Sequence, residues 1–130
     1  MWTAPRSVTV ENMVRRISTE EGRAALAAVA ATAAPARADR ATAVRYLLQL
    51  LEEKAPGNSV EVRVPPFGAV QVVEGPRHTR GTPPNVVEID AATWIALATG
   101  AELWVDAMAA GRIHASGTRA DLADLLPLRP

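Results

Sequence analysis

Hydrophobic residues recur with two different periods along this chain, and the changes of period divide it into predicted helices and strands. Apolar residues recur at helical spacing over residues 38–54, which predicts a helix there. One broad apolar face of that helix is formed by Ala41, Val44, Leu47, Leu48 and Leu51. From residue 58 the period is two, because Val60, Val62 and Val64 alternate with polar residues. Helical spacing returns after Asp90, so the pattern predicts an α+β chain.

Capping and turn residues predict where further elements begin and end. Ser18 and Glu21 have the spacing of a capping box, which predicts an alanine-rich helix over 19–33 that stops before Pro35. Residues 65–68, Pro-Pro-Phe-Gly, predict a turn from the first strand into a second strand over 69–73, and residues 86–89 predict a third. Residues 1–14 fit an edge strand around Val8 and Val10 or the start of a helix at Met13 and Val14, and the first few residues also fit a disordered lead-in.

The order of elements is clearest over residues 88–127. Asp90 predicts the start of a helix that Gly100 ends, since a residue without Cβ suits a left-handed cap. A second short helix, with Leu103, Trp104, Ala107 and Met108, ends near Gly111. Residues 112–116, with Ile113 and Ala115 on one face, then predict the last strand of the sheet. Thr118 and Asp121 predict a capped closing helix that buries Leu122, Leu125 and Leu126.

Composition excludes several classes of protein. The chain has 130 residues, with 14 basic and 14 acidic side chains, so no net field attracts it to nucleic acid or an anionic membrane. It lacks cysteine, which excludes disulfides and thiolate chemistry. No apolar run approaches the ~20 residues that span a bilayer, and no secretory signal precedes Glu11. We therefore expect a cytoplasmic protein.

Chemistry-bearing residues are few. The two histidines, His78 and His114, lack a third ligand and so predict no metal site, and we expect no cofactor. No nucleophile elbow, phosphate loop or zinc-binding helix motif occurs. The polar cluster Arg77, His78 and Arg80 lies in the Gly- and Pro-rich segment 74–84 and could hold a carboxylate or phosphate head group. An ordinary solvated loop explains the same residues.

The segments Asp90–Gly100 and Gly111–Gly117 resemble the sterol carrier protein type-two family. In that family an aspartate-started helix ends in Thr-Gly, a second helix runs into a Gly-Lys/Arg-Ile/Leu sequence, and a short strand closes on glycine. The resemblance covers residues 58–128 and is nearest to the small, actinobacterial-type bacterial branch. It implies a mainly antiparallel sheet of four to five strands covered by helices on one face. A fifth strand must come from residues 1–10 or 74–84.

The resemblance also implies an apolar pocket between the sheet and the helices for a lipid, fatty acid or sterol-like ligand. The large apolar side chains available to line it are Trp94, Leu97, Leu103, Trp104, Met108 and Phe67. We expect residues 1–17 to form an N-terminal segment and residues 18–130 a single sterol carrier-like domain. Fold alone does not assign chemistry.

Three functions follow in order of preference. The first is non-catalytic binding or carriage of a hydrophobic or amphipathic ligand. The second is an interaction module with a filled core, acting as a homo-oligomer or with a protein partner. The third is an enzyme that uses Arg77 and Arg80 on an anionic substrate. We expect no nucleic-acid partner and no integral membrane association.

Overall fold

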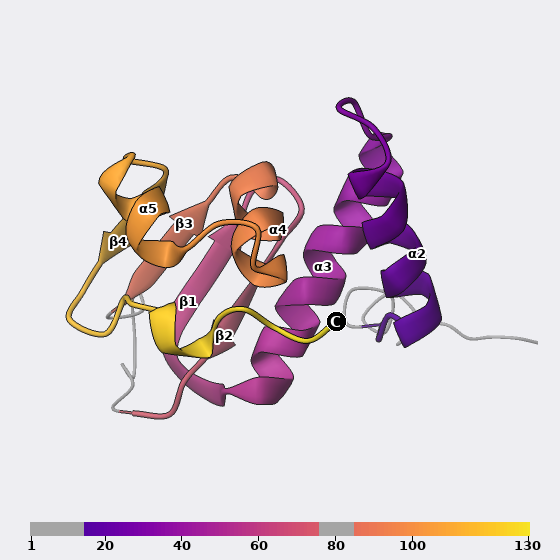
Figure 1. The fold of residues 1–130 in the computed structure, drawn as a ribbon. Coiled ribbons are helices and arrows are strands. Elements are labelled where there is room, and N and C mark those ends of the chain that lie inside the picture. The colour runs from indigo at the N-terminus through magenta and orange to yellow at the C-terminus, as the bar shows by residue number, and fades with distance from the viewer. Residues whose placement is uncertain (1–14, 76–84) are drawn as a thin grey trace, which may run out of the picture.

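A computed structural model describes residues 15–75 and 85–130. Four helices, four strands and one short 3-10 turn follow one another there (Figure 1). In chain order they are α2 (Thr19–Ala30), α3 (Arg37–Lys54), β1 (Pro56–Val64), β2 (Gly68–Val72), β3 (Val86–Ile89), α4 (Ala91–Thr99), α5 (Trp104–Ala109), β4 (Ile113–Ser116) and η1 (Ala123–Leu125). The predicted change from helix to strand falls where α3 gives way to β1.

The two N-terminal helices form where capping and hydrophobic spacing predict them. Ser18 Oγ accepts from the backbone N–H of Glu21 at 3.0 Å, and the Glu21 carboxylate accepts from the N–H of Ser18 at 3.2 Å, which confirms the capping box. Helix α2 ends at Ala30, three residues early, because the Thr32 hydroxyl accepts from the N–H of Ala34 and bends the chain into a turn.

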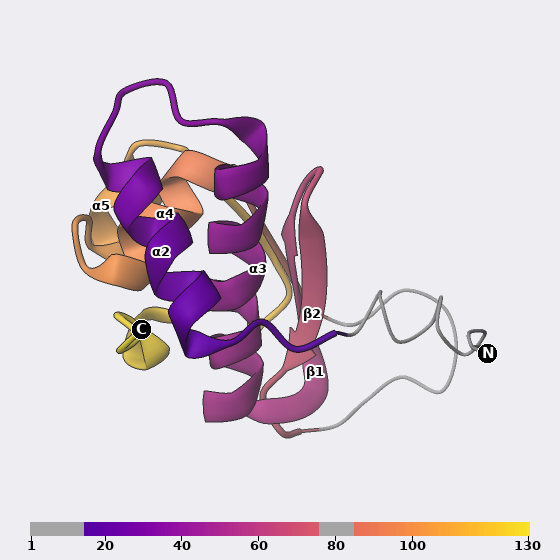
Figure 2. The same cartoon turned by 90° about the vertical axis from the view of Figure 1, so that its right-hand side faces the viewer.

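Helix α3 packs the predicted apolar face against the sheet. Val44, Leu47, Leu48 and Leu51 are all fully buried or nearly so, which confirms the helical period. Helix α2 lies against another side of α3, as the turned view in Figure 2 shows. The contact places Gly22 beneath the buried ring of Tyr46.

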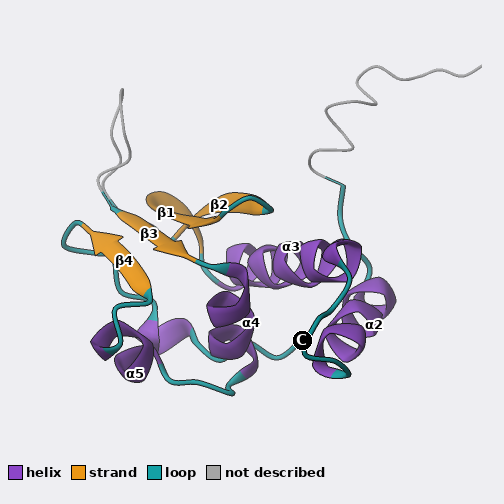
Figure 3. Ribbon diagram, turned by 90° about the horizontal axis from the view of Figure 1, so that it is seen from above, coloured by secondary structure: helices purple, strands orange, loops and turns teal. Residues whose placement is uncertain are grey.

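The four strands form one sheet in the order β2-β1-β3-β4. The β1–β2 and β3–β4 pairs are antiparallel and the central β1–β3 pair is parallel. Val60, Val62 and Val64 are fully buried on the face that the helices cover. Viewed from above in Figure 3, helices α3, α4 and α5 all lie on that one side of the sheet. The predicted α+β class, mainly antiparallel with helices on one face, is confirmed.

The predicted fifth strand is not among the described elements. Of its two sources, residues 1–10 and most of 74–84 lie outside the described residues. Glu74 and Gly75, which are described, do not belong to a strand. In the part of the chain that the structure describes, β2 is therefore an edge strand.

The prediction of a closing helix after Thr118 is wrong. The chain forms only the single turn η1, and the Asp121 carboxylate accepts from the nearby N–H of Ala123 at 2.8 Å. The following residues are extended, with the N–H of Leu128 donating to the Ala98 carbonyl at 2.8 Å. Leu128 is buried in this way, and Leu122, which comes just before the turn, is fully buried. The extended tail buries its leucines against the core without forming a helix.

Helix α4 begins and ends as predicted. The Asp90 carboxylate accepts from the N–H of Thr93 at 3.1 Å, and Gly100 closes the helix with φ of 87°. Burial raises the pKa of Asp90, but hydrogen bonds from the hydroxyl and N–H of Thr93 lower it more. The net pKa therefore lies below the usual value.

Replacing Asp90 with alanine should lower the free energy of unfolding by about 0.5–2 kcal/mol at pH 7, since the cap is lost. Because the folded-state pKa is depressed, the carboxylate's contribution is complete above its unfolded-state pKa of ~3.9 and is lost as the pH falls through the folded-state value. Urea unfolding of wild type and D90A at pH 7 and at low pH should show the difference shrink in acid. D90N, which keeps an accepting oxygen, is the control and should stay near wild type at pH 7. An equal difference at both pH values would contradict the charged-cap explanation.

Candidate functional site

Exposed apolar side chains gather on α5 and the residue before it. Leu103, Val105 and Met108 are 61%, 66% and 41% exposed, and they are the exposed large hydrophobic residues of the described chain. Trp104, four residues before Met108 and hence on the same side of the helix, is half-buried next to the core. We call Leu103, Trp104, Val105 and Met108 the α5 patch.

Helix α5 is held by few interactions. Within it only Ala107 is buried, and an alanine contributes little apolar area. The Ala107 carbonyl accepts from the N–H of Arg112 at 3.0 Å, which joins α5 to the start of β4. The helix therefore depends mainly on the segments at its two ends.

An ion pair joins those two ends. The Arg112 guanidinium donates to both carboxylate oxygens of Glu102, one of them at 2.6 Å. This hydrogen bonding holds the pKa of Glu102 below its usual range, and it raises the pKa of Arg112. The Arg112 side chain is exposed and that of Glu102 is partly buried at the surface, so we expect the pair to orient the loop before α5 more than to stabilise the fold.

The residues predicted to line a pocket occupy three different places. Leu103, Trp104 and Met108 come together in the α5 patch. Trp94 and Leu97, on α4, are buried in the core, and the Trp94 indole N–H donates to the Val44 carbonyl at 3.3 Å.

Phe67 lies apart from the α5 patch, at the turn between β1 and β2. There the Arg37 guanidinium sits 5.1 Å from the centre of its ring. The predicted head-group residues Arg77, His78 and Arg80 lie outside the described residues, and their role stays a prediction.

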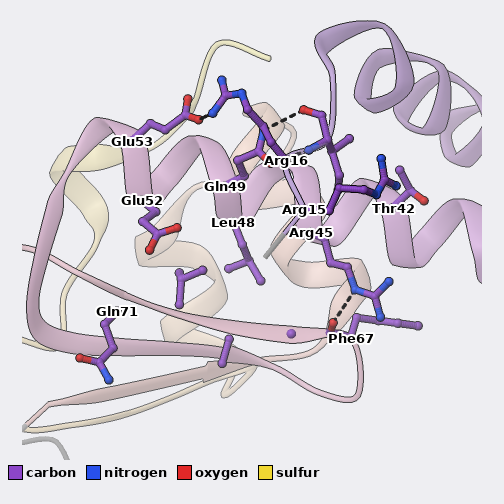
Figure 4. Close-up of a pocket in the computed structure, with 14 residues that line it drawn as sticks. Arg15, Arg16, Thr42, Arg45, Leu48, Gln49, Glu52, Glu53, Phe67 and Gln71 are labelled. Carbon is purple, nitrogen blue, oxygen red and sulfur yellow. Dashed lines mark hydrogen bonds and ion pairs between the residues drawn. The ribbon is translucent and has the colours of Figure 1, made fainter. Parts of the chain in front are cut away.

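A separate groove runs between α3 and the edge strand β2 (Figure 4). It has a volume of about 1120 Å³ and is open to solvent. Helix α3 contributes Thr42, Arg45, Leu48, Gln49 and Glu52, while residues 67–71 form the opposite wall. Residues 15–17 lie along its rim. We call this hollow the β2-edge groove.

The rim of the β2-edge groove is fastened to α3. The Gln49 side chain accepts from the N–H of Ile17 at 2.8 Å and donates to the Ile17 carbonyl at 2.9 Å. Arg16 forms an ion pair with Glu53. Because both backbone groups of one residue are held, residues 15–17 are fixed relative to the helix.

The amino-acid sequence alone does not predict this groove. Arg45 and Glu52 lie between the apolar positions of α3, and helical spacing alone indicates only that they are off its apolar face. The groove needs β2 to return beside α3, and no local pattern in residues 37–54 records that approach. The predicted turn at 65–68 pairs β2 with β1, and it does not indicate that β2 lies beside α3.

His114 lies on the open face of the sheet. It is exposed and pairs in register with Glu88 of β3, while Ile113 points to the core. Residues 15–75 and 85–130 contain no group of three or more His, Cys, Asp or Glu side chains placed to hold a metal ion. None of the helices in those ranges is long and apolar enough to cross a membrane.

Comparison with known proteins agrees with this architecture. Residues 36–128 match a family model described as "Bacterial SCP ortholog". The matched span runs from the residue before α3 to the buried tail, so it includes the whole sheet, α4 and α5. A search of curated proteins found no match to the chain.

Proposed function

This chain belongs to the bacterial sterol carrier protein family, and from that premise we propose that it binds a hydrophobic or amphipathic ligand without catalysis. The ligand class is a lipid, fatty acid or sterol-like molecule. The site is the α5 patch together with the core surface that lies beneath it.

The exposed apolar area of the α5 patch is the observation that supports this proposal. Each large apolar side chain gains roughly 1.5–3 kcal/mol on full burial, so leaving three of them in water on one short element is unfavourable unless something covers them. Clustered exposed apolar residues mark binding surfaces more often than scattered ones do.

The weak hold on α5 suggests how the ligand could reach the interior. Because Ala107 is the only fully buried residue of the helix and Trp104 is half-buried, moving α5 exposes less apolar surface than moving a core helix such as α3 would. Helix α4 lies next to α5 over the same face of the sheet, as Figure 3 shows. We therefore propose that an acyl chain or ring system first contacts Leu103, Trp104 and Met108 and then extends toward α4. Arg77, His78 and Arg80 are retained as the proposed contacts of an anionic head group.

A second candidate function is supported by the filled core. Trp94 is fully buried and Leu97 is 1% exposed, so the space beneath α4 is occupied by the protein's own side chains. On that basis the α5 patch would be covered by a protein partner or a second copy of the chain. The experiment below distinguishes the two candidates because only the first needs a small ligand.

Titration with oleate or a non-fluorescent sterol should shift Trp104 emission to shorter wavelength, since the ligand removes water from the α5 patch. The experiment uses a Trp2→Phe background, so that only Trp94 and Trp104 emit. Adding Leu103→Ser and Met108→Ser should weaken binding by about 10-fold or more, as expected for lost apolar contact.

Ala109→Ser is the matched control, because it changes an exposed residue of the same helix without removing a large side chain. It should bind as the background does. An unchanged spectrum with every lipid tested, together with a protein that self-associates less in the L103S/M108S variant, would favour the interaction module.

A further inference from the structure

The outer edge of β2 lies far along the sheet from α5 and carries backbone groups that point away from the sheet. The N–H of Glu61 donates to the Asn85 carbonyl at 2.9 Å, so Glu61 directs its backbone groups toward β3. Backbone groups alternate in direction along a strand, so the N–H and C=O groups of Val60, Val62 and Val64 point toward β2. Their partners are Val72, Val70 and Gly68.

Residues Ala69 and Gln71 therefore direct their N–H and C=O groups outward, into the β2-edge groove. No backbone partner for these groups occurs among the described residues. The side chain of Val70, between them, is on the α3 side of the sheet. Two donors and two acceptors are thus arranged as the edge of a strand that another strand could extend.

Strand β2 also lacks the features that normally protect an edge. Its sequence, Gly-Ala-Val-Gln-Val, contains no charged residue and no proline. Gly68 adds room: a Cβ built there would touch Leu48 at 3.4 Å and Arg45 at 3.7 Å, so the space toward α3 is left open by glycine.

The α3 wall of the groove places opposite charges at its two ends. Arg45 lies beside the turn, where its Nε donates to the Phe67 carbonyl at 2.8 Å. Glu52 lies two helical turns further on, about 10.5 Å along the axis, and points toward the Gln71 end in Figure 4. Neither has an ion-pair partner within the described chain. Leu48 lies between them.

The spacing of Arg45 and Glu52 along α3 is close to the length of a five-residue extended segment. Alternate residues of a strand point to the same face, and the first and fifth are about 13 Å apart, within reach of Arg45 and Glu52 given flexible side chains. A strand antiparallel to β2 would start near Glu52 and end near Arg45. Of its side chains that face α3, the one near Glu52 should be basic, the next, near Leu48, apolar, and the last, near Arg45, acidic.

We propose that the β2-edge groove binds an extended peptide segment of a partner protein as an added antiparallel strand. The segment carries a basic, an apolar and an acidic residue at alternate positions. Ala69 and Gln71 pair with its backbone, Leu48 and Val70 contact its apolar residue, and Glu52 and Arg45 pair with its charges. This site is separate from the α5 patch.

The test is binding of a fluorescein-labelled peptide, Gly-Ser-Lys-Thr-Val-Thr-Glu-Ser-Gly, to the full chain, followed by fluorescence anisotropy. Ala69→Pro removes one outward N–H and leaves the inner β1–β2 hydrogen bonds in place, so it should weaken binding by about 10-fold. Ala69→Val keeps the N–H and is the matched control. Circular dichroism and urea unfolding should show that both variants are folded.

Reversing the charge at residue 52 gives a second test. A folding defect would weaken binding of every peptide and would not change which peptide is preferred. Glu52→Lys should weaken the lysine peptide by about 3- to 10-fold and should favour a peptide with glutamate in that place. The L103S/M108S variant should bind both peptides as wild type does, so failure of the lipid proposal and failure of this one are distinguishable.

Two results would overturn the proposal. One is equal affinity of wild type and A69P for the peptide, or no binding by either. The other is sedimentation showing a wild-type dimer that A69P abolishes while the peptide does not compete, because a second copy would then occupy the edge.

Discussion

Replacing Trp94 with alanine is expected to lower the free energy of unfolding by about 3–5 kcal/mol. Trp94 is fully buried between α4 and α3, and its indole N–H donates to the Val44 carbonyl at 3.3 Å. Removing it leaves a cavity in the buried cluster to which Leu47, Leu51 and Leu97 also belong. Urea unfolding followed by circular dichroism measures the loss.

Trp94→Phe is the control that separates apolar volume from the hydrogen bond. It keeps a large ring, so it should lower the free energy of unfolding by only about 1–2 kcal/mol, less than the alanine variant does. Added indole should bind the cavity in W94A and recover part of the lost stability, as ligand binding to the folded state requires. A loss below 1 kcal/mol for W94A would show that α4 collapses onto the sheet without cost and would contradict the packing described here.

The second large effect is expected at Gly22, where alanine should destabilise the protein by about 1–3 kcal/mol. In an exposed helix interior the same substitution stabilises by about 1 kcal/mol, because glycine is a poor helix former. Here a Cβ would lie 2.3 Å from Cγ of Tyr46, a ring that is 2% exposed and cannot move aside freely. The clash should exceed the gain in helix propensity.

A double-mutant cycle with Tyr46→Leu tests that explanation. Without the ring, Gly22→Ala should become neutral or stabilising, so the two substitutions should couple by at least 1 kcal/mol. Ala24→Gly, at an exposed position of the same helix, should cost only the ordinary propensity difference of about 1 kcal/mol. Additive effects of the Gly22 and Tyr46 substitutions would contradict close α2–α3 packing at this point.

Several elements could be predicted because their signals are local. The capping box at Ser18 and Glu21, the aspartate cap at Asp90 and the left-handed Gly100 each involve residues within one turn of a helix end. The alternation of Val60, Val62 and Val64 likewise needs no knowledge of distant residues, because strand geometry alone sends them to one face.

The candidate sites were predicted less completely. Three of the six residues predicted to line an apolar pocket, Leu103, Trp104 and Met108, meet in the α5 patch because they are neighbours in sequence. Trp94 and Phe67 are equally apolar, and sequence hydrophobicity does not distinguish a core residue from one that faces a hollow. Burial of Trp94 depends on α3, about fifty residues earlier in the chain.

Periodicity and capping over a few residues predict the order of helices and strands as far as β4, most of their boundaries and the apolar face of α3, but not the short η1 turn that replaces the closing helix. Tertiary structure alone decided the parallel pairing of β1 with β3, the extended path of residues 126–128 and the β2-edge groove. Each of these arises from contacts between segments far apart in the chain. A leucine-rich tail can bury its side chains as a helix or as an extended segment. Here the extended form is held by a hydrogen bond from the N–H of Leu128 to the Ala98 carbonyl of α4. The energy of such a contact depends on where the partner lies, and local sequence does not contain that information.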